Sequence, residues 1–150
     1  MVVMATPQFN NEPTVLCVID FSTSAEKVLQ SAAQLAIKNK ARITILHPYR
    51  LNQVVKKEDL GKVKRDIDEE AALNFKKMSH ILTQGDIAYD FRSEVGFLTD
   101  RIQEHMRTSN IRMLVMDKGL ADANREALNE LTHQLEIPVI LVPQEKIAKK

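Results

Sequence analysis

Side chains that could bind a small ligand follow directly after three short apolar runs of this chain. The candidate ligand-binding residues are Asp20, Phe21, Ser22, His47, Met116, Asp117, Lys118 and Gly119. Carboxylate, hydroxyl, imidazole and ammonium groups all form hydrogen bonds with polar ligands. Asp20 and Asp117 also carry carboxylates that could share a cation. The residue types therefore indicate a polar binding site, provided that the three runs end at one place in the fold.

The motifs of the common enzyme classes are missing from the sequence. There are four glycines, none of them clustered, and neither GxxxxGK[ST], GxGxxG nor GxSxG occurs. The four histidines stand alone on different segments, so no spacing typical of a zinc site occurs. No nucleophile has a recognisable base beside it. We therefore predict that the protein is not an enzyme and has no metal site; a hydrolase of nucleotides or phosphate esters is the remaining catalytic alternative.

A phosphate-accepting regulatory domain is a competing interpretation, because such domains are also doubly wound five-stranded sheets. They need an acidic residue after the first strand, which Asp20 could supply, and an aspartate at the end of the third strand. Asp90 lies inside the third predicted strand, and no lysine stands at the end of the fifth. The sequence therefore disfavours this alternative.

Alternating apolar runs and helical patterns must position the candidate residues. The runs expected to form strands are residues 14–20, 41–47, 87–94, 111–116 and 138–143. Most are almost wholly apolar, which is typical of parallel strands buried on both faces. Helical spacing of apolar residues fills the gaps, at about residues 25–36, 54–83, 98–106 and 127–135. This order predicts an α/β fold: a doubly wound five-stranded parallel sheet, strand order 3-2-1-4-5, with helices on both faces. The carboxyl ends of such strands share one edge, where the candidate residues would converge.

The overall composition fits a single domain with a small net charge. We expect a flexible arm over residues 1–13, an α/β domain over residues 14–143 and a basic tail over residues 144–150. The formal net charge of +1 gives no reason to expect nucleic acid or a membrane as a partner. The single cysteine, Cys17, excludes an intramolecular disulfide, and the first residues lack the apolar segment of a signal peptide. A cytoplasmic location is therefore expected.

Four segments, taken in order, resemble the universal stress protein family. They are residues 14–35, 41–47, 111–116 and 138–142. The first contains a strand that ends in Asp20, a serine-containing turn and an alanine-rich helix, and the second ends in His47. The resemblance extends over nearly all of residues 14–143 and implies the same doubly wound fold. It also matches Asp20 to the aspartate on the adenine side of the family's ATP site.

The resemblance fails at the loop that holds the ATP phosphates in many members of the family. That loop follows the fourth strand and reads G-x2-G-x9-G-[ST], because glycines let backbone N–H groups approach phosphate oxygens. Asp117 and Leu120 stand at the first two glycine positions, Gly119 is out of register, and no third glycine follows. The resemblance therefore implies a regulatory or interaction protein with an unknown protein partner, for which ATP is possible but disfavoured as a cofactor. The alternative is a module that binds a nucleotide or another small ligand at the carboxyl ends of strands one, two and four.

The last predicted strand indicates how the chain would associate. Its residues Val139, Ile140, Leu141 and Val142 carry no charge, and the predicted strand order places them at an edge of the sheet. An uncovered apolar edge favours pairing with another strand. We therefore expect a homodimer through antiparallel pairing of this strand with its own copy, as in the resembling family. The alternative is a monomer protected by the flanking prolines Pro138 and Pro143.

Overall fold

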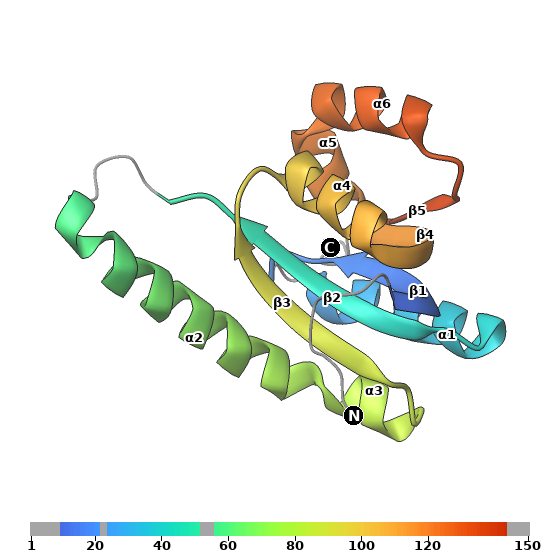
Figure 1. The fold of residues 1–150 in the computed structure, drawn as a ribbon. Helices are drawn as coiled ribbons and strands as arrows, with labels where there is room; N and C mark the ends of the chain where they lie inside the picture. Colours follow the sequence, from blue (N-terminus) through green and yellow to red (C-terminus); the bar gives the residue numbers. More distant parts are fainter. Residues whose placement is uncertain (1–9, 22–23, 52–55, 144–150) are drawn as a thin grey trace, which may run out of the picture.

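The fold is a five-stranded, wholly parallel sheet with the strand order β3-β2-β1-β4-β5 (Figure 1). It is seen in a computed structural model that describes residues 10–21, 24–51 and 56–143. The strands are β1 Asn10–Val18, β2 Arg42–Tyr49, β3 Tyr89–Val95, β4 Ser109–Asp117 and β5 Val139–Val142. The predicted fold class and strand order are therefore confirmed.

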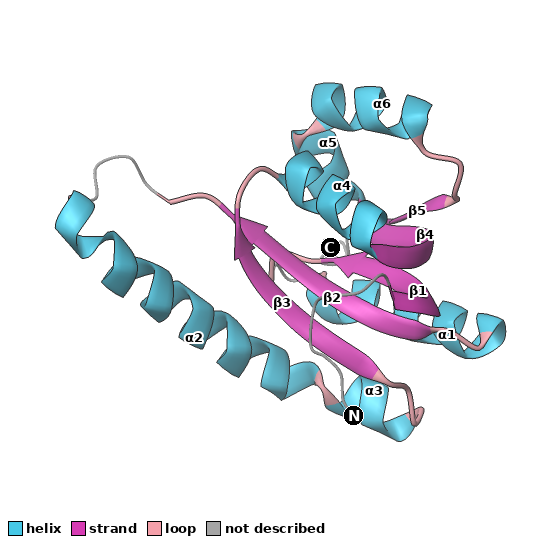
Figure 2. Ribbon diagram, in the orientation of Figure 1, coloured by secondary structure: helices cyan, strands magenta, loops and turns pink. Residues whose placement is uncertain are grey.

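Helices cover both faces of this sheet (Figure 2). They are α1 Ala25–Asn39, α2 Leu60–Met78, α3 His80–Gln84, α4 Leu98–Thr108, α5 Lys118–Ala123 and α6 Arg125–Gln134, with a short 3-10 turn, η1, at Lys57–Asp59. The first three helices lie on one face, and α4, α5 and α6 lie on the other (Figure 1). Among the described residues, no helix is both long and apolar enough to cross a membrane.

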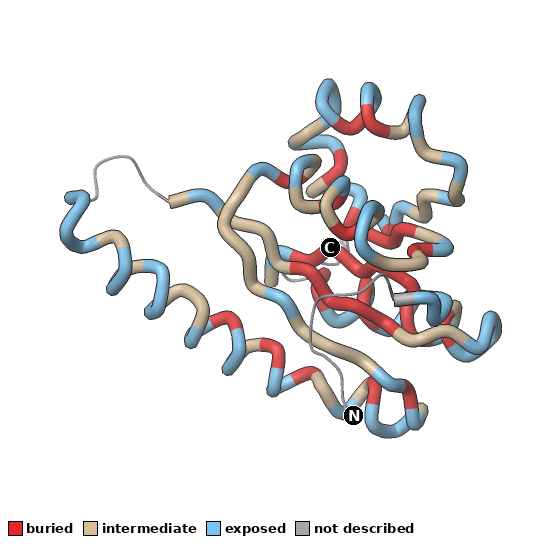
Figure 3. Tube along the Cα trace, in the orientation of Figure 1, coloured by how far each residue is buried: buried red, intermediate tan, exposed pale blue. Residues whose placement is uncertain are grey.

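The core has one layer on each face of the sheet, and β1 contributes to both. Val15, Cys17 and Ile19 pack on the α1 side, whereas Leu16 and Val18 pack on the α4 side. All five residues are buried, and the buried stretches of the chain gather on the central strands of the sheet (Figure 3). A strand with both faces covered must be apolar at every position, which explains why its sequence is a continuous run rather than an alternating one.

The first strand begins at Asn10, earlier than the predicted start of the domain at residue 14. The polar residues and Pro13 suggested a loose arm there. Instead, the side-chain amide of Asn110 donates a hydrogen bond to the carbonyl oxygen of Asn11 at 2.9 Å, and the register with β4 shifts between Asn10 and Thr14. This irregular pairing accommodates a proline, which cannot donate a hydrogen bond to the ladder. Residues 1–9 and the predicted tail at 144–150 lie outside the described residues.

One predicted helix is divided in the structure, and the last predicted helix, over residues 127–135, is preceded by a short extra helix, α5. The helix expected over residues 54–83 is interrupted at Ser79, whose hydroxyl bonds the carbonyl oxygen of Lys76 at 2.9 Å. The segment after β4 is interrupted at Asn124, whose amide bonds the carbonyl oxygen of Leu120 at 2.9 Å. Side chains of Ser and Asn that bond the preceding turn compete with regular helical hydrogen bonds. The first residues of the helix predicted over 54–83, residues 54 and 55, lie outside the described part of the chain.

Candidate functional site

A cavity of about 260 Å³ lies at the carboxyl edge of the sheet. Its walls come from the ends of β1, β2 and β3 and from α5, and its polar lining residues are Asp20, Tyr49, Arg50 and Asn124. In open α/β sheets this edge is the usual place for a ligand. The cavity is therefore the candidate functional site.

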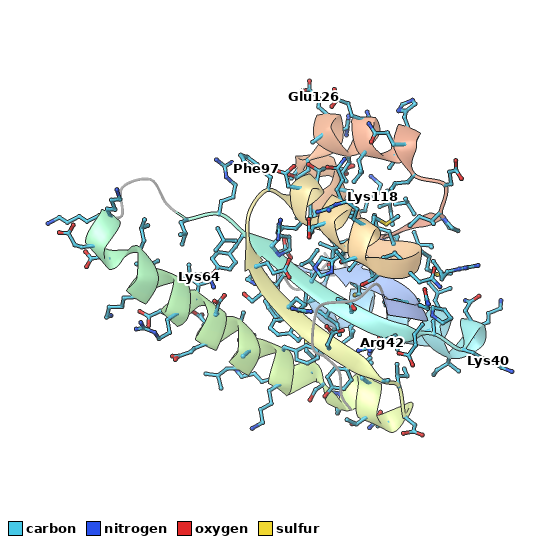
Figure 4. All side chains as sticks on the ribbon, in the orientation of Figure 1. Lys40, Arg42, Lys64, Phe97, Lys118 and Glu126 are labelled. Carbon is cyan, nitrogen blue, oxygen red and sulfur yellow. The ribbon has the colours of Figure 1, made fainter. Side chains whose placement is uncertain are left out.

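The backbone after β3 forms one wall of the cavity. The N–H of Gly96 donates a hydrogen bond to the carbonyl oxygen of Tyr49 at 2.8 Å, which joins the ends of β3 and β2. Gly96 has φ +145°, a conformation that strongly favours glycine. The chain can therefore turn sharply into α4 and place Phe97 at the cavity. The guanidinium of Arg50 lies 4.2 Å from the centre of the Phe97 ring. Phe97 lies beyond the strand tips, at the opposite end of the sheet from Arg42 (Figure 4).

Beside the cavity, β4 runs directly into α5, with Asp117 as the cap between them. Its Oδ2 accepts a hydrogen bond from the backbone N–H of Leu120 at 3.0 Å. Its Oδ1 is buried and has no hydrogen-bond partner among the described residues. Gly119 lies in the first turn of α5, and Lys118 is paired with Asp122 at 3.0 Å. The protein's own carboxylate and a short helix therefore occupy the segment that follows the fourth strand.

The predicted site residues do not all converge on this cavity. Asp20 lines it, but Met116 is fully buried in the core on the α4 side. Phe21, with φ +59°, turns towards the α1 side, where its ring lies 5.1 Å from that of His47. Ser22 lies outside the described residues. The shared edge was predicted correctly, but the side-chain directions divide the candidate residues between the two faces of the sheet.

His47 belongs to a polar network between the sheet and α2. Asp68 of α2 accepts hydrogen bonds from Tyr49 and Ser93, both at 2.8 Å, and from Lys64 at 2.7 Å. Nδ1 of His47 lies 3.2 Å from the Ser93 hydroxyl oxygen. Since Ser93 donates its only hydrogen to Asp68, Nδ1 must donate to Ser93. A catalytic triad requires the histidine between serine and aspartate, so this order is that of an anchoring network.

Burial and these hydrogen bonds shift the pKa values of the network. Burial lowers the pKa of His47, although Asp20 and Asp68 oppose the shift. Burial acts to raise the pKa of Asp68, but hydrogen bonds from Lys64, Tyr49 and Ser93 outweigh it and hold that pKa below its usual value. Burial and the bond to Asp68 raise the pKa of Tyr49. The network therefore favours a neutral imidazole and a charged Asp68.

Sequence reasoning missed Arg50, Phe97 and Asn124 as lining residues. Strand β2 continues past the predicted end at residue 47 to Tyr49, which brings Arg50 to the cavity. The end of the third strand was not considered as part of the site, although Gly96 directly after it indicated a turn. That glycine was the available signal for Phe97. Asn124 had no signal in the sequence, because its position depends on the break between α5 and α6.

A larger groove, about 530 Å³, is bounded by α4, β2 and β3 and is lined mostly by charged residues. Its arginines are paired: Arg42 and Arg92 with Asp90, at 3.2 and 3.1 Å, and Arg101 with Glu94 at 3.6 Å. A surface that neutralises its own charges offers little to an ionic ligand. Within the described ranges, no group of three or more His, Cys, Asp or Glu side chains could hold a metal ion.

Comparison with known proteins identifies the family. The profile described as "Universal stress protein family" matches residues 13–143. No curated protein sequence matches closely enough to count as a relative. Similar solved structures include a universal stress family protein from Burkholderia pseudomallei, with TM-score 0.67, 18% identity and coverage of 87% of this chain and 96% of that one.

Two further similar structures carry nucleotides. The Archaeoglobus fulgidus universal stress protein in complex with dAMP has TM-score 0.60, 19% identity and coverage of 87% and 96% of the two chains. An Arabidopsis thaliana universal stress family protein with AMP bound has TM-score 0.56, 14% identity and coverage of 89% and 92%. At these identities the likeness concerns the fold. Because the family profile extends over most of the sequence, this chain belongs to the universal stress protein family.

Proposed function

We propose that this chain is a regulatory or interaction protein of the universal stress type that acts without binding ATP. The observation that carries the proposal is the direct passage from β4 into α5, with the buried Asp117 as its cap. A phosphate site after this strand would need backbone N–H groups free to bind phosphate oxygens. The N–H of Leu120 is instead bonded to Asp117.

The balance of energies supports this proposal. Two like unit charges 4 Å apart repel by about 4 kcal/mol at an effective dielectric constant of about 20. A charge-assisted hydrogen bond contributes only about 1.5–3 kcal/mol. One phosphate beside Asp117 would therefore lose more than a single new hydrogen bond restores, and a triphosphate carries several such charges. The proposed regulatory or interaction function requires no catalytic group.

Calorimetry with ATP tests the proposal. We expect no saturable binding of ATP at millimolar concentration. The double variant Asp117→Gly, Leu120→Gly should also fail to bind, because α5 starts directly after β4 and leaves no room for the longer phosphate loop. A dissociation constant for ATP in the low micromolar range, measured on the unmodified protein, would overturn the proposal.

We also propose that the chain forms a homodimer through β5. Strand β5 is the outer strand of the sheet next to β4, and Leu141 is 42% exposed. Ile140 packs towards the α1 side and Val139 towards the α4 side. Antiparallel pairing with a second copy would satisfy the free edge and stop growth at two chains. The proposed regulatory or interaction function also includes a second protein as partner, whose identity is unknown.

A second candidate function is the binding of a small ligand at the carboxyl edge. The cavity beside Asp20 favours it, and similar structures contain cAMP, dAMP or AMP. The cavity of about 260 Å³ is smaller than the usual range of about 300–1,000 Å³ for drug-sized ligands. This candidate therefore concerns a ligand smaller than a nucleoside triphosphate.

A further inference from the structure

We propose that the charged groove between α4 and strands β2 and β3 binds a zwitterion, namely a free α-amino acid with a polar, uncharged side chain. Its volume of about 530 Å³ is within the usual range of about 300–1,000 Å³ for small-ligand pockets. The groove reaches the amino ends of β2 and β4 at Arg42 and Ser109, so it is distinct from the carboxyl-edge cavity. The inference goes beyond the proposed function and does not depend on it.

The formal charges that line the groove add up to zero when its histidine is counted as neutral. The charged lining residues are three arginines and three carboxylates: Arg42, Arg92, Arg101, Asp90, Glu94 and Glu104. A ligand with a net charge gains little from such a balanced surface. A ligand with one charge of each sign can be paired at both ends, so that neither of its charges is left uncompensated.

Arg92 is the group that can bind the carboxylate of the ligand. Its side chain is 56% exposed, and within the described part of the chain its guanidinium forms one hydrogen bond, from Nε to Oδ2 of Asp90 at 3.1 Å. The other oxygen of Asp90 is occupied as well, because it accepts a hydrogen bond from Arg42 at 3.2 Å. Both terminal nitrogens of Arg92 are therefore available, and the parallel N–H groups of a guanidinium match a carboxylate in a bidentate pair.

Glu104, on the α4 wall, is the group that can bind the ammonium of the ligand. Its Oε1 is paired with Arg107, whereas its Oε2 has no hydrogen-bond partner among the described residues. Glu94 is already engaged, because its two oxygens lie 3.1 and 3.2 Å from Nε2 of His105, and the hydrogen bond from His105 lowers the pKa of Glu94. This pair joins α4 to β3 and so holds the two walls of the groove in place.

The uncharged lining residues indicate the kind of side chain that the amino acid carries. Thr108 and Ser109 supply hydroxyl groups where α4 passes into β4, and the Thr44 hydroxyl donates a hydrogen bond to Asp90 at 2.9 Å. Among the described residues that line the groove, none has an aliphatic or aromatic side chain. An apolar ligand side chain would therefore find no packing surface, whereas an amide or hydroxyl group can form hydrogen bonds. This combination favours glutamine, asparagine, serine or threonine.

Calorimetry on the full chain with L-glutamine and two analogues tests the inference. The first analogue is γ-aminobutyramide, which is glutamine without its carboxylate, and the second is N-acetyl-L-glutamine, whose nitrogen carries no charge. Glutamine should bind at least about tenfold more tightly than either analogue, because each analogue lacks one charge-assisted contact. Arg92→Met should weaken glutamine binding by at least about tenfold and leave γ-aminobutyramide unaffected. Glu104→Gln should likewise weaken glutamine binding and leave N-acetyl-L-glutamine unaffected.

Arg112→Met is the matched control. Arg112 is exposed on β4 and does not line the groove, so its loss should leave glutamine binding unchanged. No glutamine binding at millimolar concentration, an equal loss in the control variant, or a preference for glutamine that Arg92→Met and Glu104→Gln leave unaltered would each overturn the inference. Urea denaturation of the two groove variants would show whether they are folded. ATP binding by the unmodified chain would contradict the proposed function and leave the glutamine comparison intact.

Discussion

At the scale of single residues, Asp117 determines how β4 passes into α5. Its carboxylate accepts a hydrogen bond from the backbone N–H of Leu120, and the residue caps the start of α5. Under the proposed function, the same carboxylate would also exclude a phosphate group from this position. Its second oxygen is buried without a partner among the described residues, which is a cost that the cap must offset.

The capping role can be measured by substitution. Asp117→Ala should lower the free energy of unfolding by about 1 kcal/mol, within the range of about 0.5–2 kcal/mol for a lost N-cap. Urea denaturation checks this value. Asp66→Ala is the control, because Asp66 forms an exposed pair with Lys62 within α2 and should cost no more than about 0.5 kcal/mol. Equal stability of Asp117→Ala and the unmodified chain would show that the cap contributes nothing.

His47 should make stability depend on pH. Its pKa in the folded state is lower than the ordinary value of 6.5, so the unfolded chain binds the proton more readily. The contribution of the neutral His47 imidazole to the free energy of unfolding is complete above pH 6.5. It is lost as the pH falls from there through the lowered pKa of the folded state. Asp68 and Glu94 also have lowered pKa values and add a loss at lower pH, below their ordinary carboxylate values.

Denaturation midpoints measured between pH 7.5 and 5 would separate these effects. His47→Gln should flatten the decline over this range, whereas His80→Gln, at an exposed position on α3, should preserve it. A decline of the same slope in His47→Gln would assign the pH dependence to other groups.

At the scale of elements, repeated apolar patterns in the sequence predict strands and helices. Breaks that depend on the hydrogen bond of a single side chain are missed. Buried strands were predictable because both faces are covered, so residues such as Leu16 and Val18 had to be apolar. The break at Ser79 was not predictable, because serine is tolerated inside helices and its bond to the preceding turn depends on tertiary packing. Gly85 does follow the last turn of α3, but the left-handed residue is Asp86, with φ +56°. The glycine in the sequence therefore indicated where the helix ends, but it did not indicate which residue adopts the left-handed conformation.

The proposed dimer makes a prediction for β5. Leu141→Lys should yield monomers, because Leu141 is exposed at the strand while Ile140 packs towards α1. Light scattering at micromolar concentration would detect the change in mass. The control is Leu73→Lys on α2, which replaces a leucine that is 63% exposed and should leave the mass unchanged. A mass of about 17.0 kDa for the unmodified chain would contradict the proposal.

Helix α2 is buried over only part of its length, although its apolar pattern is continuous. Its apolar stripe continues along the whole helix, yet its buried residues are Ala71, Phe75 and Met78, all in the second half. In Figure 1 the first turns of α2 extend past the tips of the strands. Periodicity predicted the stripe correctly, but it could not tell how much of the stripe the sheet would cover. That coverage depends on the length of β3, which lies on another segment.

At the scale of the whole molecule, the fold was predictable and the site was not. The order of apolar runs and helical patterns determines the crossovers, because right-handed connections leave few topologies. The carboxyl edge follows from that topology, and Asp20 was correctly placed there. The partners of Asp20 come from distant segments, and which of them face the cavity depends on the local direction of each side chain. His47 and Phe21 share that edge but face α1 and α2 instead.

The rate at which Cys17 reacts with a thiol reagent can report how often the centre of the sheet opens. Cys17 is the single cysteine, it lies on the central strand with no exposed surface, and burial raises the pKa of its thiol to about 12. A thiol reagent needs an accessible thiolate, so it can react only when β1 separates from its neighbours. Labelling of the folded chain should therefore be slow and should not speed up with more reagent once opening limits the rate, whereas the chain in urea should react at once. Labelling as fast as in urea would mean that the centre of the sheet opens without global unfolding. Ligands or a dimer partner that bind only the folded state would make these openings rarer, and slower labelling of the thiol would report that binding.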